Sequence, residues 1–147
     1  MKISIIVPCY NEQESIGLFY EEMCRVSDEI GNDFEYIFVN DGSADSTLEI
    51  IEALAQNDSR VKYISFSRNF GKESAIYAGF SKATGDYVVM MDADLQDPPK
   101  LLPEMLKYIQ QGYDSVATIL LMEDNHLCLV GEKTNGSIVG SGTGTDI

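Results

Sequence analysis

The sequence predicts an α/β sandwich built on a mainly parallel sheet. Short apolar runs suited to strands alternate with longer segments whose apolar residues recur at helical spacing. Polar clusters follow four of these runs, and they read PCYNE, NDGSADS, SRNFGKE and DADLQD. Right-handed helical crossovers should bring these clusters to one edge of the sheet, where open α/β sheets bind their ligands.

Three apolar runs in the first half of the chain are expected to be strands. They are residues 3–7, 34–39 and 61–66, and the first of them suits a strand buried on both faces. The helix after the first run should begin with a capping box formed by Asn11 and Glu14 and should end at Gly31. Ser46 and Glu49 form the same capping pattern before the next helix.

The second half of the chain repeats the alternation. A helix follows SRNFGKES and should end at Gly85, and residues 87–91 form the next expected strand. Pro98 or Pro99 should open a further helix that ends at Gly112. Residues 113–122 are the candidate for a fifth strand.

Length and composition indicate one globular domain. The chain has 147 residues, of which 44% are hydrophobic and 23% charged, so it can bury a single core. We assign residues 1–118 to this domain and residues 119–147 to an atypical, partly disordered tail. Residues 131–147 in particular are expected to be mostly disordered, because they are rich in glycine and have neither a helical nor an alternating pattern.

The charge of the chain argues against a nucleic-acid partner. Its formal net charge is -14 and its isoelectric point is near 4.2, whereas phosphate binding requires a basic face. The three cysteines form neither a CxxC pair nor a ligand spacing with His126, which favours a reducing, cytoplasmic setting. No signal peptide or membrane-spanning run is recognisable, so we expect a chain that is soluble or peripheral at the cytoplasmic face of the membrane.

The acidic cluster after the fourth strand predicts a site for a divalent cation. Asp92 and Asp94 are two residues apart where a strand ends, so in extended backbone their side chains point the same way. Gln96 lies in the same register and could supply a third oxygen. Oxygen ligands of this kind suit Mg²⁺ or Mn²⁺, which complete their shell with water and phosphate. The alternative is a solvated loop whose Asp97 precedes the next helix.

Other polar residues at the same edge have two interpretations each. Asp41 belongs to an ordinary turn sequence, but a carboxylate at a strand end can also accept hydrogen bonds from a nucleobase. Lys72 could be a solvated lysine in the first turn of a helix. A cation is less expected than an acid at a helix N-terminus, so Lys72 could instead bind an anion. Tyr10 could stack on a base, and Glu12 could assist helix initiation. Cys9 is interpreted as structural or incidental.

Three other classes of α/β protein fit the motifs less well. GKES lacks the upstream glycine of a P-loop, since Phe66 stands in its place, and Glu73 replaces the hydroxyl residue. No GxGxxG follows the first strand, which disfavours the usual dinucleotide fold. The DxD run lacks the continuation of a haloacid-dehalogenase-like phosphatase. A response-regulator receiver fits the length and the acidic loops, and it remains the best non-enzymatic alternative.

The four ordered motifs SIIVPCYNE, FVNDGSADST, RNFGKESAIYAGFSKATGD and VVMMDADLQDPP closely resemble the family 2 glycosyltransferases. The resemblance covers residues 3–118 and is most specific for the polyprenyl-phosphate branch, which includes dolichyl-phosphate mannose synthase and the bactoprenol glucosyltransferases. It implies a Rossmann-like GT-A fold, a nucleotide-diphosphate sugar of the UDP-glucose or GDP-mannose type as donor, and a polyprenyl phosphate as acceptor. It also implies inversion at the anomeric carbon.

The resemblance implies roles for individual residues as well. Asp92 and Asp94 match catalytic, metal-binding positions, and Gln96 completes the metal-binding run for Mg²⁺ or Mn²⁺. The positions that match the nucleotide-binding residues of the family are Pro8, Tyr10, Glu12, Asp41 and Lys72.

The chain departs from the family pattern after GYDSVAT. The residues that follow match none of the family's acceptor half, so we expect a C-terminally truncated chain. The alternative function is then a catalytically inactive fragment that acts as a binding or oligomerising module. Loss of the family's later strands would leave an exposed sheet edge, which predicts self-association into a homo-oligomer.

Overall fold

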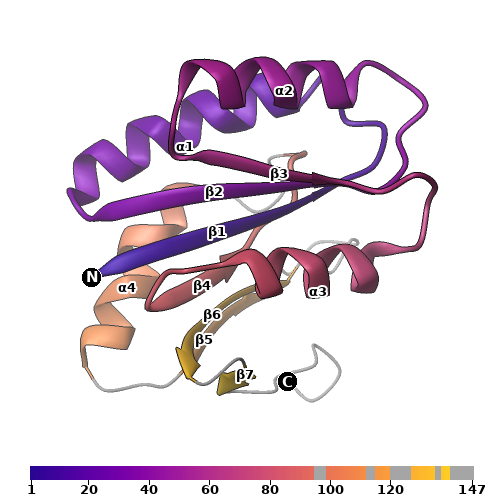
Figure 1. Ribbon diagram of the computed structural model, residues 1–147. Coiled ribbons are helices and arrows are strands. Elements are labelled where there is room, and N and C mark those ends of the chain that lie inside the picture. Colours follow the sequence, from indigo (N-terminus) through magenta and orange to yellow (C-terminus); the bar gives the residue numbers. More distant parts are fainter. Residues whose placement is uncertain (95–98, 112–114, 120–126, 135–136, 140–147) are drawn as a thin grey trace.

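The computed structural model describes residues 1–94, 99–111, 115–119, 127–134 and 137–139 (Figure 1). Its strands are β1 (Lys2–Cys9), β2 (Asp33–Asn40), β3 (Val61–Ser65), β4 (Tyr87–Met90), β5 (Ser115–Ile119), β6 (Leu127–Thr134) and β7 (Ser137–Val139). Its helices are α1 (Ile16–Ile30), α2 (Thr47–Asn57), α3 (Lys72–Lys82) and α4 (Leu102–Gln110), with a 3₁₀ turn, η1 (Pro99–Leu101), before α4. Among the described residues, no helix has both the length and the apolar character that crossing a bilayer requires.

The sheet has the order β3-β2-β1-β4-β6-β5, and β7 pairs with β6. Strands β1 to β4 are parallel, whereas β6 runs antiparallel to both β4 and β5. The prediction of an α/β fold with a mainly parallel sheet is therefore confirmed. The order 3-2-1-4 is that of nucleotide-binding folds, and it differs from the 2-1-3-4-5 order of receiver domains.

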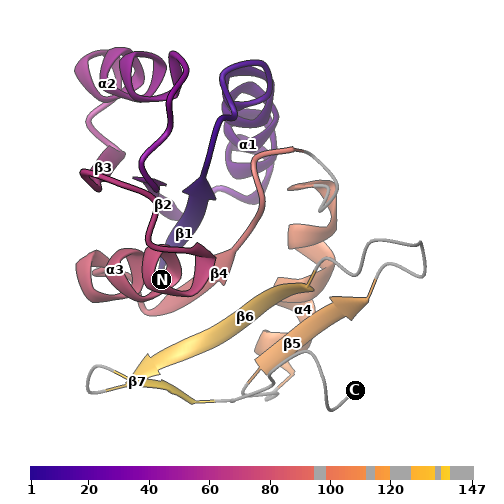
Figure 2. The ribbon, with the colours of Figure 1, turned by 90° about the vertical axis from the view of Figure 1, so that its right-hand side faces the viewer.

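Helices cover both faces of the parallel strands. Helices α1, α2 and α4 pack on one face and α3 on the other, as Figures 1 and 2 show together. The strands alternate accordingly: Ile5 of β1 faces α1 and α4, while Ile6 faces α3. Both residues are fully buried, as expected for a strand that is covered by helices on both faces.

Helix α1 begins later than the sequence predicted. It starts at Ile16 with Ser15 before it, so the expected capping box at Asn11 is wrong. Asn11 instead has a positive φ of 52° and accepts a hydrogen bond from the backbone of Ala44 in another loop. The predicted end of the helix is confirmed. Gly31 has a left-handed backbone conformation, and its amide donates a hydrogen bond to the carbonyl of Ser27.

Two further boundaries have partners that the local sequence did not reveal. Helix α2 starts after Ser46 as expected, but its first amide is bound by the carboxylate of Asp45 rather than by the Ser46 hydroxyl. Helix α3 ends at Lys82, before Gly85. A Cβ on Gly85 would lie 2.6 Å from Oγ of Ser4, so this glycine permits a close approach to β1 and does not end the helix.

The C-terminal strands extend the sheet beyond the predicted domain. Strand β5 lies within the expected range 113–122, and β6 and β7 include residues 131–134 and 137–139 of the segment expected to be mostly disordered. The division of the chain into a domain at residues 1–118 and a partly disordered tail at residues 119–147 stays a prediction. Pairing of β6 with β4 covers the edge of the parallel strands. The predicted positions Pro98 and Gly112 lie outside the described residues.

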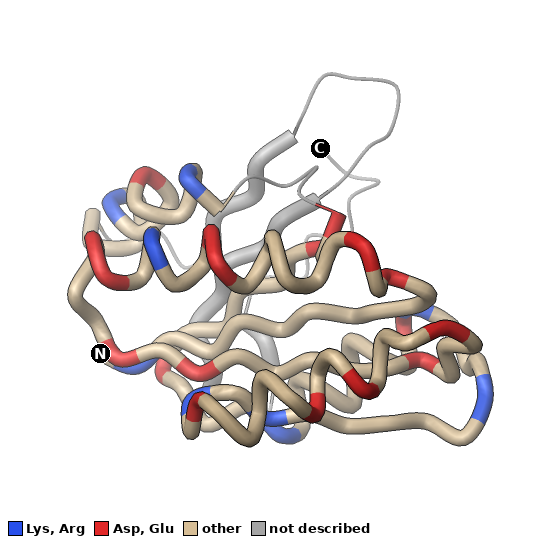
Figure 3. Tube along the Cα trace, turned by 90° about the horizontal axis from the view of Figure 1, so that it is seen from above, with Lys and Arg blue, Asp and Glu red and all other residues tan. Residues whose placement is uncertain are grey.

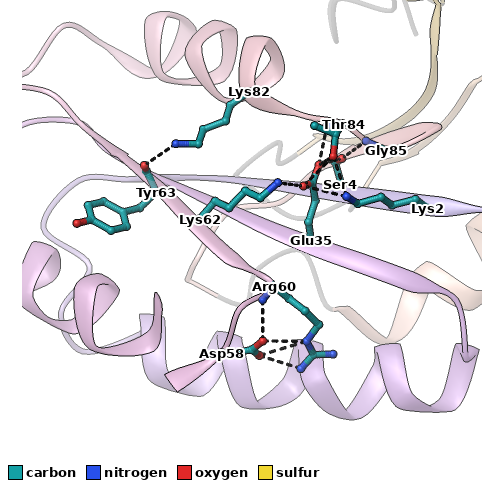
Figure 4. A network of polar contacts seen from close by, with 10 residues as sticks. All are labelled: Lys2, Ser4, Glu35, Asp58, Arg60, Lys62, Tyr63, Lys82, Thr84 and Gly85. Carbon is teal, nitrogen blue, oxygen red and sulfur yellow. Dashed lines mark hydrogen bonds and ion pairs between the residues drawn. The ribbon is translucent and has the colours of Figure 1, made fainter. Parts of the chain in front are cut away.

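A buried carboxylate joins the strands at the edge opposite the polar loops (Figure 4). Glu35 of β2 is 2% exposed, and its carboxylate accepts hydrogen bonds from Ser4, Lys62 and the backbone of Thr84. Burial alone would raise the pKa of Glu35, but these donors outweigh it and lower the pKa to about 2. Glu35 therefore remains ionised and links β1, β2, β3 and the approach to β4.

Candidate active site

The polar loops meet at the carboxyl edge of the parallel strands, as the sequence predicted. They enclose a pocket of about 240 Å³, which is lined by Pro8, Cys9, Tyr10, Glu12, Asp41, Lys72, Asp92 and Asp94. Seven of the eight predicted site residues are thus brought together, while Gln96 lies outside the described residues. The pocket also includes Cys9, which sequence reasoning had set aside.

Negative charge dominates the pocket. Four of its eight described lining residues are carboxylates and one, Lys72, is a cation. Burial raises the pKa of Glu12, and the charges of Asp94, Asp92 and Asp45 raise it further against a hydrogen bond from a neighbouring serine. An adjoining hollow of about 360 Å³ shares Glu12 and Asp94. Acidic residues are also spread over the coloured part of the trace in Figure 3. The carboxylates that line the pocket attract cations and repel an unaccompanied anion.

The two aspartates of the DxD run lie on the same side of the chain. Asp92 and Asp94 both line the pocket, whereas Ala93 between them is buried in the core. The backbone holds this arrangement, because the amide of Met91 still donates to Ile6 on β1 just before the run. Both aspartates therefore reach one pocket, although residues 93 and 94 lie in a turn and not in the extended backbone that the prediction assumed.

The donor set fits an ion that keeps water and phosphate in its shell. The described residues contain no group of three or more His, Cys, Asp or Glu side chains placed to hold a metal ion. Asp92 and Asp94 together offer two carboxylates to one pocket. Mg²⁺ and Mn²⁺ are commonly bound by one or two carboxylates with substrate phosphates completing the shell, so the residues present suit these ions.

Asp41 ties two loops together at the pocket wall. It is 3% exposed, and its carboxylate accepts hydrogen bonds from the amide of Phe70 at 2.8 Å, the amide of Gly71 at 3.1 Å and the side chain of Asn69 at 3.2 Å. Asp41 thereby fixes the start of α3, where Lys72 lies. A carboxylate has about four acceptor positions, and donors among the described residues take up three of those of Asp41.

The loop after β1 is interlocked with the loop after β2. The amide of Asn11 donates to Oγ of Ser43 at 3.0 Å, and Oδ1 of Asn11 accepts from the amide of Ala44 at 2.8 Å. The amide of Glu12 donates to the hydroxyl of Thr47 at 2.9 Å. These contacts position the pocket residues on either side of Asn11. Sequence reasoning missed them, and the motif positions alone carry no signal for the pairing.

Tyr10 and Cys9 contribute different surfaces to the pocket. The side chain of Tyr10 is 50% exposed and offers a ring face on which a planar base can stack. The thiol of Cys9 is buried and contacts the carbonyl of Val7. Burial raises the pKa of Cys9 strongly, and the charges of Glu12 and Asp92 add to the effect. Cys9 is therefore a neutral thiol, which fits the structural interpretation.

Gly42 allows the backbones of two pocket loops to touch. Its φ is +68°, and a Cβ there would lie 2.2 Å from the carbonyl carbon of Arg68 and 2.3 Å from the amide nitrogen of Asn69. Both neighbours are backbone atoms, which cannot rotate away as a side chain could. Any larger residue therefore separates the loop after β2 from the loop that precedes α3.

We expect Gly42→Ala to lower the free energy of unfolding by about 2 kcal/mol, because the left-handed backbone and the close contact each cost about 1 kcal/mol or more. Urea unfolding measures the change. The control is Gly17→Ala in α1, where no atom lies within 4 Å of the added methyl group; it should match or exceed wild-type stability. A Gly42→Ala protein as stable as the wild type would contradict this packing.

The sequence also matches known proteins over most of its length. Residues 4–125 match the family model described as Glycosyl transferase family 2. CsbB of Bacillus subtilis (strain 168) is 54% identical over 114 residues, which cover 78% of this chain and 35% of CsbB. The prophage bactoprenol glucosyl transferase homolog of Escherichia coli (strain K12) is 46% identical over 116 residues, covering 79% and 38%.

A third relative is the undecaprenyl-phosphate 4-deoxy-4-formamido-L-arabinose transferase of Photorhabdus laumondii. It is 42% identical over 118 residues, which cover 80% of this chain and 36% of the relative. The chain thus spans 35 to 38% of the length of these three proteins.

Solved structures agree with the fold. The mannosyltransferase PcManGT from Pyrobaculum calidifontis, in complex with GDP-Man and Mn²⁺, superimposes with a TM-score of 0.68 at 24% identity, covering 80% of this chain and 35% of that one. S. aureus TarS 1-349, in complex with UDP-GlcNAc, gives a TM-score of 0.62 at 26% identity, covering 78% and 33%. The receiver alternative is removed by the strand order and by these matches, and the chain belongs to glycosyl transferase family 2 with a GT-A fold.

Proposed function

We propose that this domain binds a nucleotide-diphosphate sugar together with Mg²⁺ or Mn²⁺ and presents the sugar for transfer to a polyprenyl phosphate. The observation that carries the proposal is the gathering of Asp92, Asp94, Lys72, Asp41 and Tyr10 around one pocket at the carboxyl edge of the sheet. Without a metal ion, the carboxylates of this pocket would repel a diphosphate. A divalent cation between them would offset this repulsion. The neighbours named with GDP-Man and UDP-GlcNAc support the class of donor.

Each residue has a distinct task in this proposal. Asp92 and Asp94 hold the cation, and Gln96 is the proposed third ligand. Tyr10 stacks on the base, and Asp41 uses its remaining acceptor position for a donor of the base or the ribose. Pro8 and Glu12 form the rest of the nucleotide wall, and Lys72 donates to the diphosphate. When bound, the cation neutralises the negative charge that grows on the departing diphosphate.

The proposed acceptor is a polyprenyl phosphate, a class that appears in the names of the bactoprenol and undecaprenyl-phosphate relatives. An oxygen of its phosphate forms a bond to the anomeric carbon while the bond from that carbon to the diphosphate oxygen breaks. Because the attacking oxygen is already anionic, this step requires no strong general base. Attack from the side opposite the leaving group inverts the anomeric centre.

Calorimetric titration with UDP-glucose and GDP-mannose, each with and without Mn²⁺, tests the donor half of the proposal. We expect one of the two to bind at least tenfold more tightly with Mn²⁺ than without it. Failure of both to bind in the presence of Mn²⁺, for a chain that is folded by circular dichroism, would contradict the proposal.

A second candidate function is a binding or oligomerising module without transferase activity. The described pocket fits both candidates, because the residues that line it are proposed to bind the donor and the metal. Incubation with radiolabelled donor and a polyprenyl phosphate distinguishes the two. Labelled lipid product supports the transferase, whereas donor binding without product supports the module.

A further inference from the structure

Lys72 contacts one of the two aspartates proposed to hold the metal. Its Nζ atom lies 2.7 Å from Oδ1 of Asp92, and the two side chains are 58% and 16% exposed. Lys72 is the first residue of α3. Among the eight described residues that line the pocket, it is the one positive charge, and it faces four carboxylates.

The position of Lys72 is not explained by the helix that carries it. A cation at a helix N-terminus is disfavoured by the macrodipole, so the acids of the pocket are the attraction that draws the ammonium inward. The contact is not rigid, because a lysine side chain has a flexible stem with four carbons and a compact charge. Lys72 can therefore exchange one anionic partner for another within its reach.

We infer that Lys72 is an internal counter-ion that competes with the divalent cation for Asp92 and transfers to the donor's diphosphate when both ligands bind. This inference rests on the proposed function and adds an order of events to it. A metal ion and an ammonium group cannot both sit against one carboxylate oxygen without repelling each other. The diphosphate removes the repulsion, because it offers Lys72 a second anionic partner.

This exchange couples the two ligands. A diphosphate that draws Lys72 away from Asp92 raises the affinity of the site for the metal, and the metal raises the affinity for the diphosphate by the same factor. When the metal binds without nucleotide, part of its binding free energy must offset the loss of the ion pair between Lys72 and Asp92. The coupling therefore favours the complete complex over a site that holds metal alone.

The test measures Mn²⁺ affinity by electron paramagnetic resonance of the free ion, with and without UDP or GDP, in the wild type and in Lys72→Met. We expect Lys72→Met to bind Mn²⁺ alone about three- to tenfold more tightly than the wild type, since a competing charge is gone. With saturating Mn²⁺, the same variant should bind the nucleoside diphosphate about tenfold more weakly. Lys72→Arg keeps the charge and should retain the wild-type coupling.

The matched control is Lys107→Met on α4, an exposed lysine outside the pocket lining. It changes the net charge of the protein equally and should leave both affinities at wild-type values. Equal Mn²⁺ affinity in the wild type and Lys72→Met, with Mn²⁺-dependent nucleotide binding intact, would overturn the inference and leave the proposed function standing. Absence of Mn²⁺ binding in both proteins, with and without nucleotide, would overturn both.

Discussion

Replacing Asp94 by alanine is expected to weaken Mn²⁺-dependent binding of the donor about 100-fold, which corresponds to about 3 kcal/mol. Asp94 lines both the main pocket and the adjoining hollow. In the proposed site Asp92 and Asp94 are the two carboxylate ligands, so the variant would keep one of them and hold the divalent ion less tightly. Calorimetry with and without Mn²⁺ measures the change.

The fold should survive this substitution. Asp94 lies in the turn after β4, outside the two hydrophobic clusters of the core. The control is Asp28→Ala on the exposed face of α1, which removes the same charge far from the pocket and should not alter donor binding. Mn²⁺-dependent binding of wild-type strength in Asp94→Ala would exclude Asp94 as a metal ligand.

The second large effect is expected at the opposite edge of the sheet. Glu35→Gln should lower the free energy of unfolding at pH 7 by about 3 kcal/mol. Burial, which would raise the pKa of Glu35, is outweighed by its hydrogen-bond donors, and the resulting fall from 4.5 to about 2 corresponds to about 3 kcal/mol of preference for the ionised form. The glutamine keeps the shape of the side chain but loses the charge that pairs with Lys62 and Lys2.

The effect of Glu35→Gln depends on pH with a definite sign. Because folding lowers the pKa of Glu35, its contribution is complete above pH 4.5 and is lost as the pH falls toward 2. Urea unfolding at pH 7 and pH 2.5 should therefore show a difference between wild type and variant that shrinks in acid. Glu49→Gln, an exposed change on α2, is the control. A difference that stayed constant with pH would contradict the charge-based explanation.

The parallel core and the contents of the pocket could be predicted because their causes are local. Residues 3–7 are apolar except for Ser4, which is typical of a strand buried on both faces of a sheet. When four such runs alternate with helices, right-handed crossovers place the loops that follow the strands at one edge of the sheet. Asp92 and Asp94 come soon after the end of β4, so their place at this edge follows from the position of the strand. The sequence thus indicated both the sheet and the edge at which the site lies.

Features that depend on distant partners could not be predicted. Asn11 was interpreted as a helix cap, but its partners Ser43 and Ala44 lie more than 30 residues away. Glu35 bonds to groups 27 to 49 residues away, although one signal was present: a carboxylate inside an apolar strand needs buried partners. Strand β6 pairs with β4, which is distant in sequence, so no local sequence pattern predicted this pairing.

The three donors that Asp41 accepts come from one short stretch of backbone and side chain, residues 69–71. The segment that leads into α3 is therefore held by the carboxylate of Asp41 in the loop after β2. Replacing that carboxylate would free residues 69–71 to change conformation. Every side chain on this segment would then lose its fixed position relative to the pocket. Scanning mutagenesis should consequently rank Asp41 among the most sensitive positions of the chain, even for a ligand that never touches it.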